Sequence, residues 1–90
     1  MSAKVLMYCT AACPFCQAAE RLLAQKGATI EKVRVDLQPE LRAEMTQKAG
    51  GRRTVPQIWI GGRHVGGCDD LYELERKGEL DPLLKVKDSE

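Results

Sequence analysis

The feature that most constrains the chain is a pair of cysteines, Cys13 and Cys16, separated by a proline and a phenylalanine. A short apolar run, residues 5–8, precedes the pair, and a helix-like stretch, residues 17–26, follows it. The pair therefore lies where a strand ends and a helix begins, and Pro14 suits the first helical position because its missing N–H costs nothing there. Thiols three residues apart share one face of a helical turn and can bridge as a disulfide.

Cys13 is predicted to be the N-cap of this helix. In that position its sulfur faces the unpaired N–H groups of the first turn and the positive end of the helix dipole. This setting favours the thiolate, which is the form that attacks disulfides. We therefore predict that Cys13 is the nucleophile and that Cys16, one turn further on, is the resolving thiol.

Two metal-based interpretations of the same cysteines are less favoured. A structural zinc site requires four ligands, and beyond the pair the chain offers only Cys9, Cys68 and His64 as Cys or His ligands. The spacing Cys9-x3-Cys13-x2-Cys16 resembles the cluster loop of radical SAM enzymes, whose barrels are much larger than 90 residues. A redox dithiol without metal is the preferred interpretation, with Cys9 a packed small side chain and His64 an exposed strand residue.

Length and charge indicate one small domain over residues 1–90. Fourteen basic and thirteen acidic residues leave a formal charge of +1, which predicts neither a nucleic-acid nor a membrane partner. The apolar runs are far shorter than the ~18 residues that suggest a membrane span. The four cysteines would allow three pairings in a secreted protein. Because residues 1–4 carry no export-signal pattern, we expect reduced thiols and a cytoplasmic location.

Hydrophobic patterns and turn residues predict a β-α-β-α-β-β-α order, with a short last helix and a polar tail over 85–90. The first strand, helix and strand form a βαβ unit, so the two strands should be parallel. Gly61-Gly62 predicts a hairpin between the last two strands, which are therefore antiparallel. An α/β protein with a four-stranded mixed sheet flanked by helices follows, although the strand order does not. The predicted strands cover residues 4–9, 29–36, 57–60 and 63–66, and the main helices begin near residues 14, 39 and 69.

Three motifs together resemble the dithiol glutaredoxins of the bacterial type, over roughly residues 4–84. They are Cys13-Pro14-Phe15-Cys16, Arg53-Thr54-Val55-Pro56 and Gly66-Gly67-Cys68-Asp69-Asp70-Leu71. The resemblance implies a thioredoxin fold in which a cis peptide bond before Pro56 faces the active-site cysteines.

The same resemblance implies that glutathione is the partner and the reductant. The Val55 backbone would pair with the cysteinyl portion of glutathione, in a groove shaped by Thr54. Asp69, with the turn at Cys68, would hold the γ-glutamyl end. Phe15, which stands where many members have tyrosine, belongs to the same predicted site.

The chain also departs from the family near the first cysteine, where Thr10 replaces a common lysine. One cation for a glutathione carboxylate is therefore missing. Arg53 is predicted to bind the glycyl carboxylate instead, through two parallel hydrogen bonds. Arg52 is expected to be a solvated loop residue.

The predicted function is the reduction of protein disulfides and glutathione mixed disulfides by a monomer that binds no cofactor. Its partners would be glutathione and disulfide-containing or glutathionylated proteins. Two alternatives stay open. One is a thioredoxin-like reductase served by a flavoenzyme. The other is an iron–sulfur carrier in which Cys13 from two chains and two glutathiones supply the four thiolates that such clusters take; Pro14 argues against it by stiffening the loop.

Overall fold

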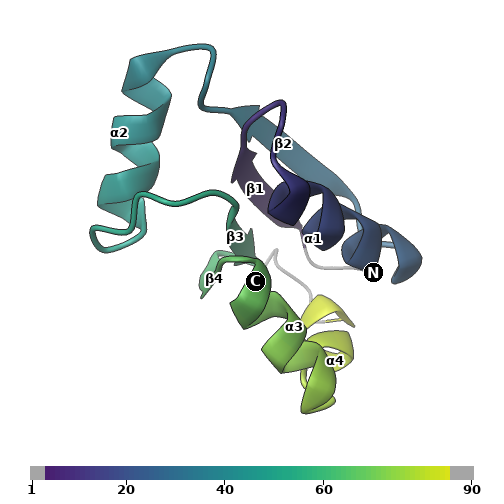
Figure 1. Ribbon diagram of the computed structural model, residues 1–90. Helices are drawn as coiled ribbons and strands as arrows, with labels where there is room; N and C mark the ends of the chain where they lie inside the picture. Colours follow the sequence, from purple (N-terminus) through teal and green to yellow (C-terminus); the bar gives the residue numbers. More distant parts are fainter. Residues whose placement is uncertain (1–3, 86–90) are drawn as a thin grey trace.

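The computed structural model describes residues 4–85, so residues 1–3 and most of the predicted polar tail, 86–90, lie outside the described part. Within this part the order of elements confirms the predicted one (Figure 1). The elements are β1 (Val5–Cys9), α1 (Pro14–Gln25), β2 (Ile30–Arg34), α2 (Pro39–Lys48), β3 (Gln57–Ile60), β4 (Arg63–Gly66), α3 (Cys68–Arg76) and α4 (Leu80–Lys85).

The four strands form one mixed sheet in the order β2-β1-β3-β4, which the sequence left open. β1 is parallel to β2 and antiparallel to β3, and β4 is antiparallel to β3. Tyr8 near the end of β1 lies opposite Gln57 at the start of β3. The loop that leaves β1 and the loop that enters β3 therefore meet at the same end of the strands.

The core has two sides because the side chains of β1 alternate between the faces of the sheet. Val5 and Met7 pack with residues of α1, α3 and α4, whereas Tyr8 packs with residues of α2. Figure 1 shows this division, with α2 lying apart from the other three helices. The larger cluster contains Val5, Met7, Cys9, Cys13, Cys16, Ala19, Leu22, Leu23, Ile58, Ile60, Leu71, Leu80 and Leu84.

Helix α1 is fixed on the sheet by an apolar stripe that includes Ala19, Leu22 and Leu23, all buried. Burial of one leucine side chain contributes about 1.5–3 kcal/mol. The helix begins with Pro14 in its first turn and is followed by Gly27, whose φ of 76° suits a glycine after a helix end. Packing of α1 thus holds the N-terminus of the helix next to the end of β1.

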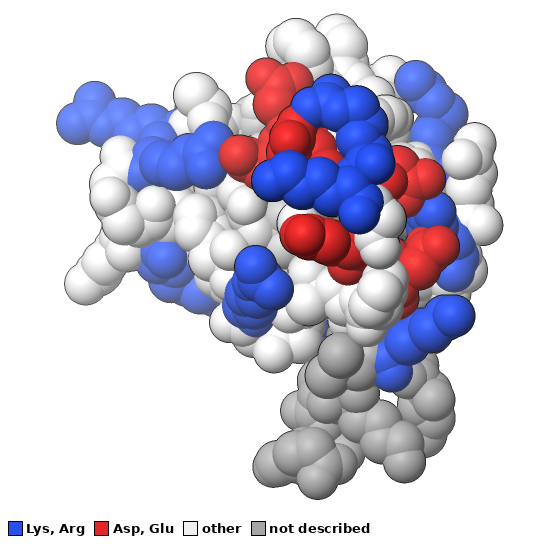
Figure 2. Space-filling view, turned by 90° about the horizontal axis from the view of Figure 1, so that it is seen from below, with Lys and Arg blue, Asp and Glu red and all other residues white. Residues whose placement is uncertain are grey.

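Charged side chains join α1 to the C-terminal helices. The Lys26 ammonium lies 2.8 Å from a carboxylate oxygen of Glu75 and 2.9 Å from one of Asp81. Figure 2 shows that Lys and Arg atoms lie beside Asp and Glu atoms on the face drawn there. No helix within residues 4–85 is long and apolar enough to cross a membrane.

Strand β2 ends earlier than the predicted range of 29–36. The Arg34 guanidinium donates to Asp36 at 2.7 Å, and this short-range ion pair accompanies the turn that closes the strand. Val35 is still buried, and its N–H donates to the Cys9 carbonyl at 2.9 Å. The apolar pattern therefore indicates correctly that Val35 is buried, although this residue lies outside the strand.

Candidate active site

Cys13 is the N-cap of α1, as the sequence predicts. Its backbone is extended, with φ −127° and ψ 102°, and its sulfur accepts a hydrogen bond from the Cys16 N–H at 3.2 Å. The Cys13 carbonyl accepts from the Gln17 N–H at 3.0 Å, which closes the first helical turn. The Cys13 sulfur therefore faces a backbone N–H at the N-terminus of α1, which is the position predicted for the nucleophile.

Cys16 lies one turn inside the helix and is buried, with 4% of its surface exposed. Burial raises the pKa of the Cys16 thiol to about 12, and the hydrogen bond with Cys13 acts in the same direction. Cys16 is therefore a thiol at neutral pH. The two sulfurs thus have unequal environments, as a nucleophile and a resolving thiol require.

The loop before β3 faces the thiols. The Val55–Pro56 peptide bond is cis, as the family resemblance implies. The Cys13 thiol lies 3.8 Å from the Val55 carbonyl oxygen, within reach of a weak S–H···O contact. Backbone from residues far away in the sequence is therefore held against the candidate nucleophile.

A cleft of about 240 Å³ lies between this loop and the start of α3. Within it, Phe15 and Asp69 are exposed and Cys68 is half-buried. Every residue predicted for the glutathione site except Arg53 lines this cleft. The lining residues are Phe15, Arg52, Thr54, Val55, Pro56, Gly67, Cys68, Asp69 and Asp70.

The two arginines of the loop lie in different hollows. Arg52 lines the cleft, and its guanidinium pairs with Asp70 at 3.1 Å. Arg53 lines a neighbouring groove of about 780 Å³ against α2, where Arg42 also lies. Arg52 is an exposed loop residue, as expected, but the sequence did not predict its ion pair with Asp70 or its place in the cleft. Arg53 stays a prediction for the glycyl carboxylate, from the side of that neighbouring groove.

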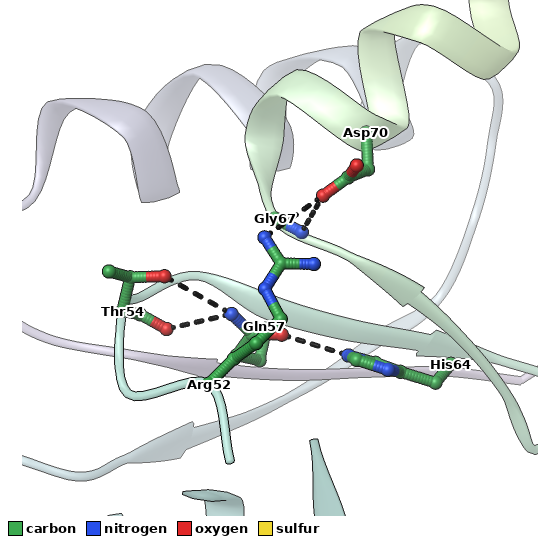
Figure 3. A network of polar contacts seen from close by, with 6 residues as sticks. All are labelled: Arg52, Thr54, Gln57, His64, Gly67 and Asp70. Carbon is green, nitrogen blue, oxygen red and sulfur yellow. Dashed lines mark hydrogen bonds and ion pairs between the residues drawn. The ribbon is translucent and has the colours of Figure 1, made fainter. Parts of the chain in front are cut away.

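Asp70 is the third residue of α3, and its side chain binds back to Gly67, the N-cap residue of the helix. Its Oδ2 accepts from the Gly67 N–H at 2.8 Å and also meets Arg52 (Figure 3). The Gly67 hydrogen bond and the Arg52 charge lower the pKa of the Asp70 carboxyl. Gly66 permits this contact, because a Cβ there would collide with the Asp70 carboxylate. Asp69 accepts no hydrogen bond within residues 4–85, so its carboxylate is free to meet a ligand.

A second polar contact lies under the same loop and was not foreseen. The Gln57 amide donates to the Thr54 carbonyl at 3.0 Å and to its hydroxyl at 3.3 Å, and it accepts from His64 at 2.8 Å (Figure 3). The expectation that His64 is an exposed strand residue is wrong, because its ring is half-buried and stacks on Trp59 at 4.7 Å. A glutamine placed between a proline and an apolar strand was the available signal.

The other two cysteines lie nearby without forming a disulfide. Cys9 is buried at the end of β1, and burial raises the pKa of its thiol. Burial also raises the pKa of Cys68, and the Asp69 charge adds to the shift. Among residues 4–85 no group of three or more His, Cys, Asp or Glu side chains is arranged to hold a metal ion.

A cysteine at a helix N-cap, a second buried thiol one turn further on and a cis-proline loop facing them define a thiol–disulfide oxidoreductase of the thioredoxin fold. The glutaredoxin family model matches residues 5–65. The chain belongs to the glutaredoxin family.

Relatives match over nearly the whole chain. A glutaredoxin of Pseudomonas aeruginosa is 58% identical over 82 residues, which are 91% of this chain and 96% of that protein. The solution structure of a Brucella melitensis glutaredoxin has a TM-score of 0.82 at 52% identity and covers 93% of this chain and 90% of its own. The crystal structure of a buckwheat glutaredoxin–glutathione complex has a TM-score of 0.84 at 33% identity. The match covers 91% of this chain and 76% of the buckwheat chain.

Proposed function

We propose that the chain reduces glutathione mixed disulfides and protein disulfides, with glutathione as the reductant and no bound cofactor. The observation that carries the proposal is the cleft beside Cys13, which gathers a backbone edge at Val55 and a free carboxylate at Asp69. A tripeptide with a peptide backbone, an amine and two carboxylates complements such a surface. The similarity to a buckwheat protein solved with glutathione supports the same ligand.

In this proposal each wall of the cleft meets one part of glutathione. The Val55 backbone pairs with the cysteinyl peptide, which brings the glutathione sulfur to Cys13. The Asp69 carboxylate, beside the turn at Cys68, meets the γ-glutamyl amine. Thr54 and Pro56 shape the groove, and the exposed ring of Phe15 covers it. Arg53 meets the glycyl carboxylate from the neighbouring groove.

The first chemical step is attack by the Cys13 thiolate on the glutathione sulfur of a mixed disulfide. A new disulfide forms between Cys13 and glutathione, the old bond breaks, and the substrate leaves as a thiolate that takes a proton from solvent. A second glutathione thiolate then attacks the bound glutathione sulfur. This step gives oxidised glutathione and restores the Cys13 thiolate. The net exchange consumes one free glutathione and converts the mixed disulfide into the substrate thiol and oxidised glutathione.

A protein disulfide follows the dithiol branch. Cys13 forms a mixed disulfide with one substrate sulfur, and Cys16, losing its proton, attacks the Cys13 sulfur and releases the second substrate thiol. The resulting Cys13–Cys16 disulfide is reduced by two glutathiones in turn. The buried, protonated state of Cys16 keeps it from competing with Cys13 for the first attack.

The test is a reduction assay on a small glutathione mixed disulfide, coupled to reduction of oxidised glutathione, together with mass spectrometry after incubation with oxidised glutathione. We expect turnover in the parent protein and one glutathione adduct on Cys13 in the Cys16→Ser variant, where no resolving thiol can release it. Turnover only with a flavoenzyme reductase and no adduct would favour the thioredoxin-like alternative. A coloured dimer after anaerobic purification would favour the cluster carrier.

We place this activity in a reducing compartment, the cytoplasm, where such thiols persist. The four cysteines of the described chain are all unpaired, in keeping with that proposal. The protein acts as a monomer on disulfide-containing or glutathionylated proteins. Gel filtration of the reduced chain tests the oligomeric state.

A further inference from the structure

Gln57 is the one buried amide or charged side chain within residues 4–85, and the chemistry proposed above makes no use of it. It exposes none of its surface and is the first residue of β3, directly after Pro56. Burial of an amide costs several kcal/mol unless its hydrogen bonds are made. Its partners therefore show what the residue does.

Both ends of the Gln57 amide have partners. The nitrogen donates to the carbonyl and the hydroxyl of Thr54, and the oxygen accepts from His64 (Figure 3). Within the described residues no buried side-chain nitrogen or oxygen lacks a partner. The link therefore runs from β4, through the buried amide, to the backbone of the loop that faces Cys13.

The chemistry of the three groups determines the direction of every hydrogen bond. The Thr54 carbonyl can only accept, so the amide must present its NH₂ group to it. The amide oxygen then faces His64, whose Nε2 must carry the hydrogen. Burial lowers the pKa of His64; the Arg52 charge acts in the same direction, and the Asp70 charge opposes it. A doubly protonated ring would still donate from Nε2, so the link does not act as a pH switch.

His64 itself is held by packing. It lies opposite Trp59 in the β3–β4 pairing, and the two rings stack with centroids 4.7 Å apart and planes inclined by 28°. Aromatic rings prefer such an offset-stacked arrangement, so the contact fixes the orientation of the imidazole. The donor nitrogen therefore has a defined position relative to β3.

The loop is also held at its other end. Arg52 pairs with Asp70 on α3, while Thr54 is held by Gln57 (Figure 3). Val55 lies next to Thr54, with its carbonyl oxygen 3.8 Å from the Cys13 sulfur. Two separate contacts thus determine where the Val55 backbone stands.

We propose that Gln57 is a positioning residue for thiol–disulfide exchange and that His64 sets the orientation of its amide. Together they hold the backbone at Thr54 and Val55 where it can pair with a glutathione-bearing substrate. This inference rests on the proposed function for the identity of the ligand. It concerns binding geometry, because neither side chain lines the cleft or touches the thiols.

The test compares His64→Phe with Gln57→Met in the full chain. Phenylalanine keeps a ring for Trp59 and removes the donor, and methionine keeps the length of glutamine and removes both hydrogen-bonding ends. The exposed neighbour variant Arg63→Ala is the matched control. With a cysteine–glutathione mixed disulfide as substrate, we expect KM to rise about fivefold to tenfold in both variants, from the loss of a buried hydrogen bond. We expect kcat to stay within about twofold and Cys13 alkylation against pH to be unchanged, since α1 is untouched.

A double variant sharpens the assignment. Because the two residues act through one link, His64→Phe combined with Gln57→Met should raise KM no further than the larger single effect. A rise in KM equal to the product of the two single rises would show that the residues act independently and would overturn the role of His64. If Gln57→Met fails to fold, His64→Phe still provides the test, because His64 is only half-buried and its replacement disturbs the core less.

Backbone order parameters measured by NMR, without glutathione, separate this inference from the proposed function. We expect the order parameters of the Thr54 and Val55 N–H bonds to fall in His64→Phe, with those of the β1 amides unchanged. Wild-type protein that lacks glutathione activity but shows this local change would refute the proposed ligand and retain the positioning role. Unchanged order parameters at Val55 with unchanged KM would overturn the inference, and so would a general fall in the order parameters across β1.

Discussion

The Cys16 backbone N–H donates a hydrogen bond to the sulfur of Cys13, at 3.2 Å, so the residue that supplies the second thiol also holds the sulfur of the first in place. This backbone contact does not depend on the Cys16 side chain. Replacing the Cys16 sulfur should therefore leave the nucleophile in its setting.

The first prediction separates the two cysteines by role. Cys13→Ser should abolish all activity, because no other group stands at the helix N-cap. Cys16→Ser should still remove glutathione from mixed disulfides, with a second glutathione completing the cycle, but should lose most reduction of protein disulfides. The two assays, run side by side on both variants, check this. Equal loss on a glutathione mixed disulfide would refute the single-thiol branch.

A second prediction concerns pH. With its pKa raised to about 12, Cys16 has a thiolate fraction near pH 8 of only about one in ten thousand. Alkylation of reduced protein between pH 6 and 9 should therefore label Cys13 and spare Cys16. Above that range, labelling of Cys16 should rise about tenfold per pH unit, as mass spectrometry of quenched samples can follow. Early labelling of Cys16 in the folded protein would contradict its buried, protonated state; unfolded protein is the control.

The third prediction compares the two loop arginines. Removal of a charge-assisted hydrogen bond costs about 1.5–3 kcal/mol, which corresponds to a tenfold or larger loss in affinity. Arg53→Ala should raise KM for glutathione by about that factor, with little change in the free energy of unfolding because its side chain is exposed. Added salt should reproduce part of the effect in the parent protein.

Arg52→Ala is the matched variant for this comparison. It removes the ion pair with Asp70 and should act mainly through the shape of the cleft, with a smaller dependence on salt. A larger, salt-sensitive rise in KM for Arg52→Ala than for Arg53→Ala would move the carboxylate site into the cleft.

Much of the fold could be predicted because its signals are local. Pro14 after a capping cysteine marks the start of α1, and Gly61-Gly62 marks the hairpin between β3 and β4. The strand order could not be predicted, because the position of β3 beside β1 depends on how both faces of β1 pack. The end of β2 was misplaced because Val35 is buried beyond the last ladder residue.

The candidate site divides in the same way. Cys13 and Cys16 could be assigned from spacing and helix capping alone, whereas the distinction between Arg52 and Arg53 could not. Side-chain directions in an irregular loop depend on distant partners, and here Asp70 on α3 selects Arg52. The burial of His64 likewise depends on a cross-strand contact that alternation along β4 does not encode.

The last prediction concerns Asp70, whose carboxylate accepts from the N–H of Gly67, the N-cap residue of α3, and pairs with Arg52. Its pKa is lowered in the folded protein, so the stability it contributes is present above the unfolded value of about 3.9 and is lost as the pH falls through the lower, folded value. Asp70→Ala should reduce the free energy of unfolding at pH 7 by about 0.5–1.5 kcal/mol, the usual net contribution of one hydrogen bond. Its unfolding curve in urea should also change less between pH 7 and 3 than that of the parent. Asp69→Ala, whose carboxylate accepts no hydrogen bond within residues 4–85, is the control and should keep the parent's pH dependence. Equal pH dependence in Asp70→Ala and the parent would show that the Asp70 carboxylate contributes nothing to the acid sensitivity of the fold.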